Sequence, residues 1–190
     1  MTPVSVPQPN VAHERRSALL VAALFILCLL AGWLVKTAVQ NNTRPVEIGG
    51  FTANVPDGWL VQEGAGDLLF VARNPQALDE LYRVSQLPIA PDLAVLAENR
   101  NLARARLDDT YRVLTAEPIV FAGQDGYKVS FARVDLASPG LPHVIEGLDY
   151  YFPDGEQVTV LSLEAQSDQF AEALPGFQAF VQSVDGISGE

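Results

Sequence analysis

An uninterrupted apolar run at residues 17–35, SALLVAALFILCLLAGWLV, is the strongest pattern in this sequence. Nineteen residues pass without a charge, and eleven of them are Leu, Ile, Val or Phe. A helix of that length spans about 28 Å, close to the thickness of a bilayer's hydrocarbon core. A helix in a soluble core would carry polar residues on its outer face, and this run carries none after Ser17. The pattern therefore predicts a transmembrane helix over 17–35.

Beyond residue 45 the apolar positions recur at shorter periods, which predict strands joined by tight turns. The segment FTANVPDGWL at 51–60 predicts a strand, a turn at Pro56-Asp57-Gly58 and a returning strand, with Trp59 buried beside the turn. Asp154-Gly155 marks a second hairpin. Strands are expected at 51–55, 60–62, 68–73, 82–87, 113–121, 127–134, 143–152 and 157–163.

Two segments carry helical spacing instead. Pro91 and Asp92 open the first, and its expected apolar face consists of Leu93, Leu96, Ala103 and Leu107. Ser167 is a candidate N-cap for the second, in which the apolar residues are Phe170, Leu174, Phe177 and Val181. Pro175 lies inside this second segment, so we expect a short first turn and then a restart.

The elements divide the chain into four parts. Residues 1–16 are expected to form a disordered tail, 17–35 the transmembrane helix, 36–45 a linker and 46–186 one soluble domain. The fold class predicted is α+β, an antiparallel β-sheet flanked by helices and preceded by one transmembrane helix. A domain of about 145 residues buries roughly two-thirds of its extended surface, so it needs neither metal nor disulfide to fold.

Charge restricts the partners of this domain. From Pro45 onward there are 8 Lys and Arg against 22 Asp and Glu, a net charge of −14. Nucleic acid is therefore not expected as a partner, because binding phosphates needs a basic surface. Arg15 and Arg16 precede the apolar run, which favours a cytoplasmic N-terminus and an extracytoplasmic C-terminal domain. The single cysteine, Cys28, lies inside the run.

Four segments together resemble the PsbP-like superfamily. They are GGFTANVPDGWLV, GDLLFVARNP, EPIVFAGQDGYKVSFARV and the closing YYFPDGEQVTVLSLEAQSDQFAEALPGFQAFVQSV. The resemblance covers about residues 50–184 and is closest to membrane-anchored bacterial envelope members of the DcrB and LpqN type. It implies an α/β/α sandwich, a scaffold used mostly for protein binding. No metal-, photosystem- or Ran-binding residue of the superfamily can be matched in this sequence.

The chemistry-bearing residues predict no catalytic, cofactor or metal site. His13 and His143 are the two histidines, and with one His and no Cys the domain lacks the ligands of the usual nitrogen and sulfur metal site. A nucleophile–His–acid triad would have to use His143, which we expect to be an exposed strand-edge residue. The acidic residues Asp149, Asp154 and Glu156 do not have calcium-loop spacing.

The arginines of the first predicted helix say more about possible partner binding than the histidines and carboxylates do. Arg100 and Arg104 lie four residues apart on the first predicted helix, with Arg106 close by, so something acidic should offset their repulsion. That offset is either internal pairing, with Asp108, Glu98 or a neighbouring strand, or the acidic patch of a partner. The possible partner-binding residues are therefore Arg100, Arg104, Arg106 and Trp59.

Function is expected to follow from anchoring and binding. The sequence predicts a single-pass, membrane-anchored, non-catalytic accessory or binding module of the bacterial cell envelope, which meets an unknown protein partner near the bilayer. The alternative is a carrier or sensor domain for a small apolar or envelope molecule. A carrier needs an apolar pocket of about 300 Å³ or more with a few polar groups. A protein-binding module needs an exposed apolar or arginine-rimmed patch.

Overall fold

The computed structural model describes residues 21–33, 42–77, 79–136 and 141–185. The chain forms two units, Met1–Asn42 and Thr43–Glu190, which are described separately below. The second unit begins three residues before the start at 46 that the sequence predicted, because a strand already starts at Thr43.

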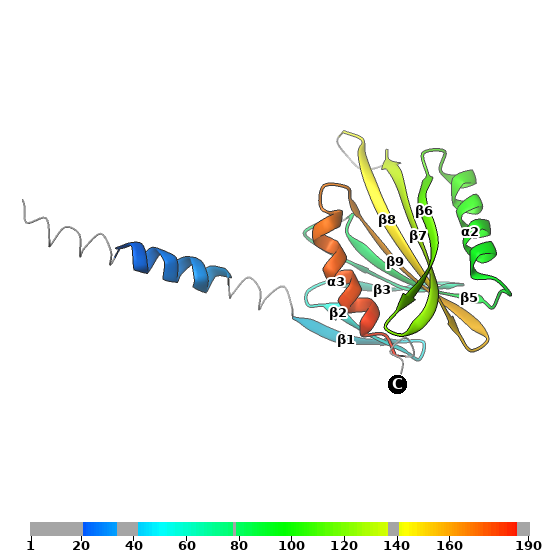
Figure 1. Cartoon of the computed structure of the whole chain (residues 1–190), viewed down its shortest axis with the longest axis horizontal. Helices are drawn as coiled ribbons and strands as arrows, with labels where there is room; N and C mark the ends of the chain where they lie inside the picture. Colours follow the sequence, from blue (N-terminus) through cyan, green and yellow to red (C-terminus); the bar gives the residue numbers. More distant parts are fainter. Residues whose placement is uncertain (1–20, 34–41, 78, 137–140, 186–190) are drawn as a thin grey trace, which may run out of the picture. The chain divides into compact units, whose positions relative to one another are not determined.

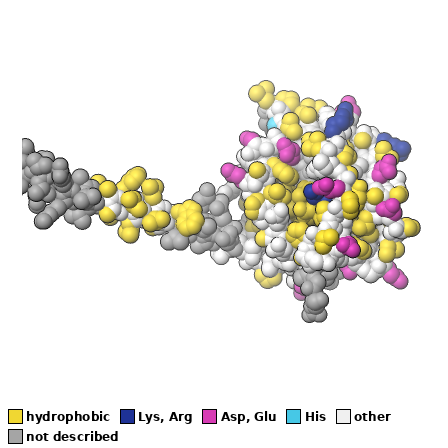
Figure 2. Space-filling view, viewed as in Figure 1, with side chains coloured by type: hydrophobic (Ala, Val, Ile, Leu, Met, Phe, Trp, Pro, Cys, Tyr) yellow, Lys and Arg dark blue, Asp and Glu magenta, His cyan; other side chains and the backbone are white. Residues whose placement is uncertain are grey.

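A single helix, residues 21–33, is the described part of the first unit. All of its residues are exposed, and hydrophobic side chains cover the face of it that is visible in Figure 2. Among the residues that the structure describes, no helix combines the length and the apolar character that a bilayer crossing requires. The predicted span of 17–35 extends past this helix at both ends, and those ends, like the predicted 1–16 tail, lie outside the described residues.

The second unit contains two antiparallel sheets (Figure 1). A two-stranded sheet pairs β1 with β2, and a seven-stranded sheet has the order β3-β4-β5-β9-β8-β7-β6. The strands are β1 (Thr43–Ile48), β2 (Phe51–Pro56), β3 (Leu60–Glu63), β4 (Leu68–Arg73), β5 (Leu81–Pro88), β6 (Arg112–Phe121), β7 (Gln124–Asp135), β8 (His143–Asp154) and β9 (Gln157–Gln166). The hairpin predicted at Asp154-Gly155 joins β8 to β9, as expected.

The segment at 51–60 differs from its prediction. Its two strands do not pair with each other: β2 pairs with β1, and β3 pairs with β4. The turn is formed, with Gly58 at a φ of 80° and Trp59 N donating to Pro56 O, but it carries the chain from one sheet to the other. Trp59 is buried as predicted, with its ring centroid 4.5 Å from that of Tyr82.

The helices α2 (Leu93–Leu107) and α3 (Phe170–Gln182) lie on opposite faces of the large sheet (Figure 1). The side chains of strand β9 contribute to both faces of the sheet, because alternate residues of a strand point to opposite faces. Leu161, Leu163 and Ala165 belong to the core under α3, whereas Val158 and Val160 pack with residues of α2. The antiparallel α+β sandwich expected from the sequence is therefore confirmed.

Helix α2 starts where the sequence predicted, and the first half of its predicted apolar face is correct. The Asp92 side chain accepts a hydrogen bond from Ala94 N at 2.7 Å and caps the helix. Of the predicted apolar face, Leu93 and Leu96 pack against the core, whereas Ala103 and Leu107 are exposed, Leu107 to 91%. The buried positions are Ala97 and Asn101. The reason is that the sheet is apolar beneath the first half of α2, whereas along the second half Asn101 and Arg104 meet the polar groups of Tyr111 and Asp149.

Two predictions for helix α3 are also wrong. Ser167 is not its N-cap; the cap position is Gln169, which makes no side-chain capping bond. The helix runs through Pro175 without a restart. A proline inside a helix removes one backbone bond and costs about 3 kcal/mol. Burial of Phe177, Phe180 and Val181 against the sheet offsets that cost.

Gly147 of β8 allows close packing across the sheet. It pairs with Phe131 of β7, whose ring covers it, and a Cβ at position 147 would lie 2.1 Å from Phe131 Cζ. We expect Gly147→Ala to lower the free energy of unfolding by about 1–3 kcal/mol through overpacking, measured by urea denaturation. Adding Phe131→Leu should restore part of the loss, and an unchanged midpoint in Gly147→Ala would contradict this packing.

Candidate functional site

A groove lies between helix α2 and strand β6. Its volume is about 590 Å³. We call it the α2–β6 groove, and its apolar lining is Ala94, Ala97, Leu102 and Ala105 of α2 with Val113 and Ala116 of β6. Alanines on both walls are too short to meet across the gap, so the helix and the strand leave the space open. The pocket criterion stated above for a carrier, about 300 Å³ with apolar walls, is met.

Polar groups converge at the floor of this groove. The Tyr111 hydroxyl donates to Asn101 Oδ1 at 2.7 Å, and both side chains line the groove. Arg104 Nη1 donates to the Tyr111 hydroxyl at 3.3 Å and to Asp149 Oδ2 at 2.5 Å. Its guanidinium also lies over the Phe131 ring, 4.9 Å from the centroid. We call Asn101, Arg104, Tyr111 and Asp149 the Arg104 network.

Burial and charge shift the pKa values within this network. Burial of the Arg104 guanidinium opposes its charge, but the Asp149 carboxylate and Tyr111 outweigh that cost and raise the Arg104 pKa. Burial raises the pKa of Tyr111, against the opposing charge of Arg104. Burial and then the charge of Asp149 raise the pKa of Tyr151, whose hydroxyl donates to Asp149. Arg104 therefore stays charged and both tyrosines stay neutral at physiological pH.

Strand β6 forms an edge of the large sheet beside the groove. Among the described strands it pairs only with β7. Its exposed apolar side chains include Val113, Leu114 and Val120. The register with β7 shifts between Val113 and Thr115. Pro118, which has no backbone N–H, interrupts the row of backbone hydrogen-bond donors along the strand. A bulge and a proline limit uncontrolled pairing at this edge, and an edge strand presents on its open side the backbone groups that do not bond to its one neighbour.

Beyond the end of α2 the same sheet face carries an ion-pair cluster. Glu164 of β9 has a side chain that is 4% exposed, and it pairs with both Arg83 and Arg133. These three side chains and Arg104 line a second, smaller cavity of about 160 Å³. Both arginines are therefore engaged with one buried carboxylate, which leaves this group of three with a net charge of +1.

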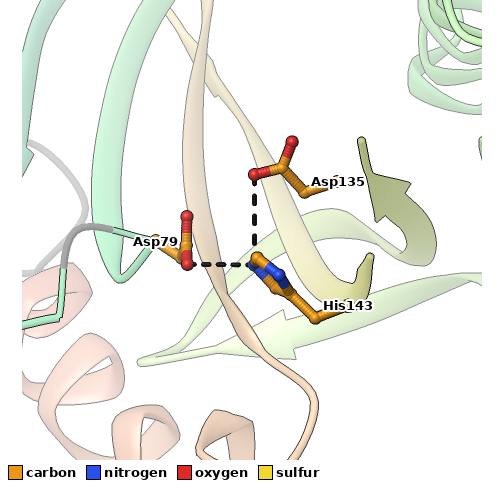
Figure 3. A group of neighbouring side chains, drawn as sticks. All are labelled: Asp79, Asp135 and His143. Atoms are coloured by element: carbon orange, nitrogen blue, oxygen red, sulfur yellow. Dashed lines mark hydrogen bonds and ion pairs between the residues drawn. The ribbon is translucent and has the colours of Figure 1, made fainter. Parts of the chain in front are cut away.

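Farther along this face, Asp79, Asp135 and His143 come together (Figure 3). His143 Nε2 lies 3.0 Å from Asp79 Oδ2 and 3.9 Å from Asp135 Oδ2. Gln166 Nε2 donates to the same Asp79 oxygen at 2.8 Å. His143 is therefore not the exposed strand-edge residue that the sequence predicted; its side chain is 27% exposed and contacts two acids. We call Asp79, Asp135 and His143 the His143 cluster.

Part of the His143 cluster could have been found from the sequence. Asp135 and His143 are direct partners in the β7–β8 register, so a correct alignment of that hairpin pairs them. Asp79 precedes β5, which reaches β8 only through β9, and no local pattern brings it there.

The predicted partner-binding residues lie in separate places. Arg104 is paired inside the domain with Asp149 of strand β8, which is one of the two offsets that the sequence left open. Arg106 is exposed on α2, and Arg100 is half-buried there. Trp59 belongs to the core under α3, on the other face of the sheet from the arginines. Their role toward a partner stays a prediction.

Comparison with known proteins gives structural but not sequence relatives. No protein-family model and no curated protein matches the sequence. The solution structure of cyanobacterial PsbP (CyanoP) from Synechocystis sp. PCC 6803 matches 75% of this chain and 91% of its own, with a TM-score of 0.57 and 14% identity. The Ran-binding protein Mog1p of Saccharomyces cerevisiae matches 77% of this chain and 96% of its own, with a TM-score of 0.50 and 15% identity.

LpqN of Mycobacterium tuberculosis, a protein involved in cell envelope biogenesis, matches at a TM-score of 0.46 and 13% identity, over 77% of this chain and 93% of its own. At these identities the likeness concerns the fold, and the agreement with CyanoP extends over nearly all of that protein. The Thr43–Glu190 unit therefore has the PsbP-like fold that the sequence resemblance implied.

Proposed function

We propose that this protein is a single-pass, membrane-anchored, non-catalytic binding module of the bacterial cell envelope. Its α2–β6 groove takes an extended apolar segment of a protein partner at the membrane. The observation that carries the proposal is the position of this apolar groove directly beside the edge strand β6.

The groove and the edge strand complement each other as a peptide site. An extended segment that adds to a sheet edge gains main-chain hydrogen bonds, and adjacent pockets select its alternate side chains. Here the β6 backbone supplies the bonds, and the alanine-lined walls supply the apolar pocket. The polar floor at Asn101 and Tyr111 offers hydrogen bonds to a side chain that reaches down. Mog1p, which shares the fold, is a Ran-binding protein, so the scaffold is compatible with protein binding.

Anchoring is proposed from the apolar run. Residues 17–35 carry no charge, and the exposed side chains of its described helix include Leu24, Phe25, Leu27 and Leu30. Such a surface is unfavourable in water and favourable in lipid. With the N-terminus cytoplasmic and the domain outside, tethering raises the effective concentration of the groove near membrane partners. The charge of −14 makes nucleic acid an unsuitable partner.

A second candidate function is a carrier or sensor for a small apolar molecule. The volume of about 590 Å³ and the polar floor favour it. Against it, the groove is an open channel between a helix and a strand, whereas sites for small ligands usually bury 70–90% or more of a ligand's surface.

Filling the groove should separate binding from folding. We expect Ala105→Trp, at an exposed position that lines the groove, to reduce partner binding about tenfold, which corresponds to 1.4 kcal/mol. Ala103→Trp is the matched control, since Ala103 is exposed on the same helix and does not line the groove. The measurement is photo-crosslinking in membranes that contain the full chain, with a photoreactive amino acid replacing Val113.

Three results decide between the candidates. A protein-sized crosslink that Ala105→Trp removes and Ala103→Trp keeps supports the proposal. A crosslink that adds only the mass of a small molecule, with the same dependence on the two variants, establishes the carrier instead. A crosslink that is equal in both variants overturns a role for the groove.

A further inference from the structure

We propose that the His143 cluster binds a divalent transition-metal ion, with Zn²⁺ as the probe. Asp79, Asp135 and His143 each offer one ligand atom, and these three atoms lie within 4.8 Å of one another. They come from three separate segments: the loop before β5, the end of β7 and the start of β8. This inference is independent of the proposed function, because the groove uses none of these residues.

The distances between the ligand atoms suit one ion. Zinc lies about 2.0–2.2 Å from imidazole nitrogen and carboxylate oxygen, so atoms that share an ion lie roughly 3–4 Å apart. The Nε2–Oδ2 distances from His143 to Asp79 and to Asp135, 3.0 Å and 3.9 Å, fall in that range. In Figure 3 both carboxylates are directed at the imidazole. A small shift of side chains that are 14–27% exposed would bring all three onto one ion.

The donor types also suit a transition metal. One imidazole and two carboxylates form a mixed nitrogen and oxygen set, which suits zinc or manganese better than calcium, for which all-oxygen ligands are usual. Water molecules can complete the coordination, because the cluster is open to solvent. A set with only three protein ligands and an open position is usual for reactive or exchangeable sites rather than for structural ones.

Neighbouring groups hold the ligands in place. Gln166 Nε2 donates to Asp79 Oδ2 and thereby positions that carboxylate. His143 Nε2 is hydrogen-bonded to Asp79 Oδ2 at 3.0 Å, and Nδ1 lies 3.5 Å from Leu141 O; when Nε2 binds a metal ion in place of this bond, Nδ1 carries the ring proton and faces that carbonyl. Hydrogen bonds of this kind from outside the ligand set orient ligating histidines and carboxylates in metal sites.

The charges leave room for a dication. Two carboxylates face one imidazole, and the Arg133 guanidinium, which also acts on Asp135, is shared with Glu164. A dication bound between the two carboxylates balances both of their charges.

The test is a calorimetric titration of the full chain in detergent with Zn²⁺ alone. We expect one site that Asp135→Asn weakens at least tenfold, since even residues outside the ligand set cost about 10–100-fold in metal affinity. Asp125→Asn is the matched control, because Asp125 lies on the same strand, is exposed and is remote from the cluster. Zinc should also raise the melting temperature of the wild type and of Asp125→Asn but not of Asp135→Asn.

Contrary results are equally definite. Equal zinc affinity in Asp135→Asn and Asp125→Asn places the ion elsewhere and overturns the proposal. So does a wild-type dissociation constant weaker than about 100 µM, which corresponds to adventitious binding only. If Asp135→Asn does not fold, His143→Gln replaces it with the same expected loss. Ala105→Trp should bind zinc normally, so failure of the groove proposal leaves this result unaffected.

Discussion

Replacing Arg104 with Ala is expected to lower the free energy of unfolding by about 3–5 kcal/mol. The reason is the environment of its partner, since the Asp149 side chain is fully buried and Arg104 is its counter-charge at 2.5 Å. Removing one member of a buried pair leaves the other without compensation, which costs more than the pair itself contributes. The measurement is urea denaturation of the full chain in detergent, followed by tryptophan fluorescence.

Matched variants separate this effect from a general loss of positive charge. Arg106→Ala removes the same charge from an exposed position of α2 and should change stability by less than about 0.5 kcal/mol. Replacing both partners, as Arg104→Met with Asp149→Leu, should recover much of the loss, because no charge then remains buried. If Arg104→Ala is as mild as Arg106→Ala, water reaches Asp149 and the network is not a buried one.

Phe177→Ala should produce a loss of similar size, about 3–5 kcal/mol. Phe177 is fully buried between α3 and the sheet. Its ring centroid lies 5.3 Å from that of Tyr82, 5.8 Å from that of Tyr150 and 6.1 Å from that of Phe180. Truncation removes these contacts and leaves a cavity. The cavity cannot close, because the strands on one side and the helix on the other hold their positions. The same denaturation experiment measures it.

A phenylalanine at the start of the same helix provides the control. Phe170 is only half-buried, so Phe170→Ala should cost less than half as much as Phe177→Ala. Equal losses for the two variants would mean that the aromatic cluster does not dominate the packing of α3.

The strands from β2 to β9 and the hairpin at Asp154-Gly155 could be predicted because their signals are local, whereas β1, which begins inside the predicted linker, was missed. Apolar and polar residues alternate along 127–134, a pattern typical of a strand with one buried face, and Val129 and Phe131 on the apolar side are buried. The turn residues fixed the β8–β9 connection. The order of such signals along the chain was also sufficient to suggest the PsbP-like fold, which the likeness to CyanoP supports.

Features that depend on distant partners could not be predicted. The turn at 56–58 predicts a reversal but not that the two strands join different sheets. The leucine spacing on α2 misplaced the second half of its buried face, because Asn101 and Arg104 find their partners in Tyr111 and Asp149. The His143 cluster depends on the β5–β9–β8–β7 order, which no local pattern specifies.

The join between β5 and β9 has a consequence for how the chain is made. Strands β3 to β5 pair with their neighbours in sequence, and so do strands β6 to β9. Strand β5, however, can pair with β9 only after β9 has been synthesised. The paired residues of these two strands that are closest in sequence are Pro88 and Gln157. A ribosome needs on the order of 3–14 s to add the intervening stretch. During that time the nascent strand β5, with Tyr82 and Val84, has neither its final neighbour nor α3 above it. Early termination before Gln157 would therefore release two half-sheets with open apolar edges, and such products should be prone to aggregate.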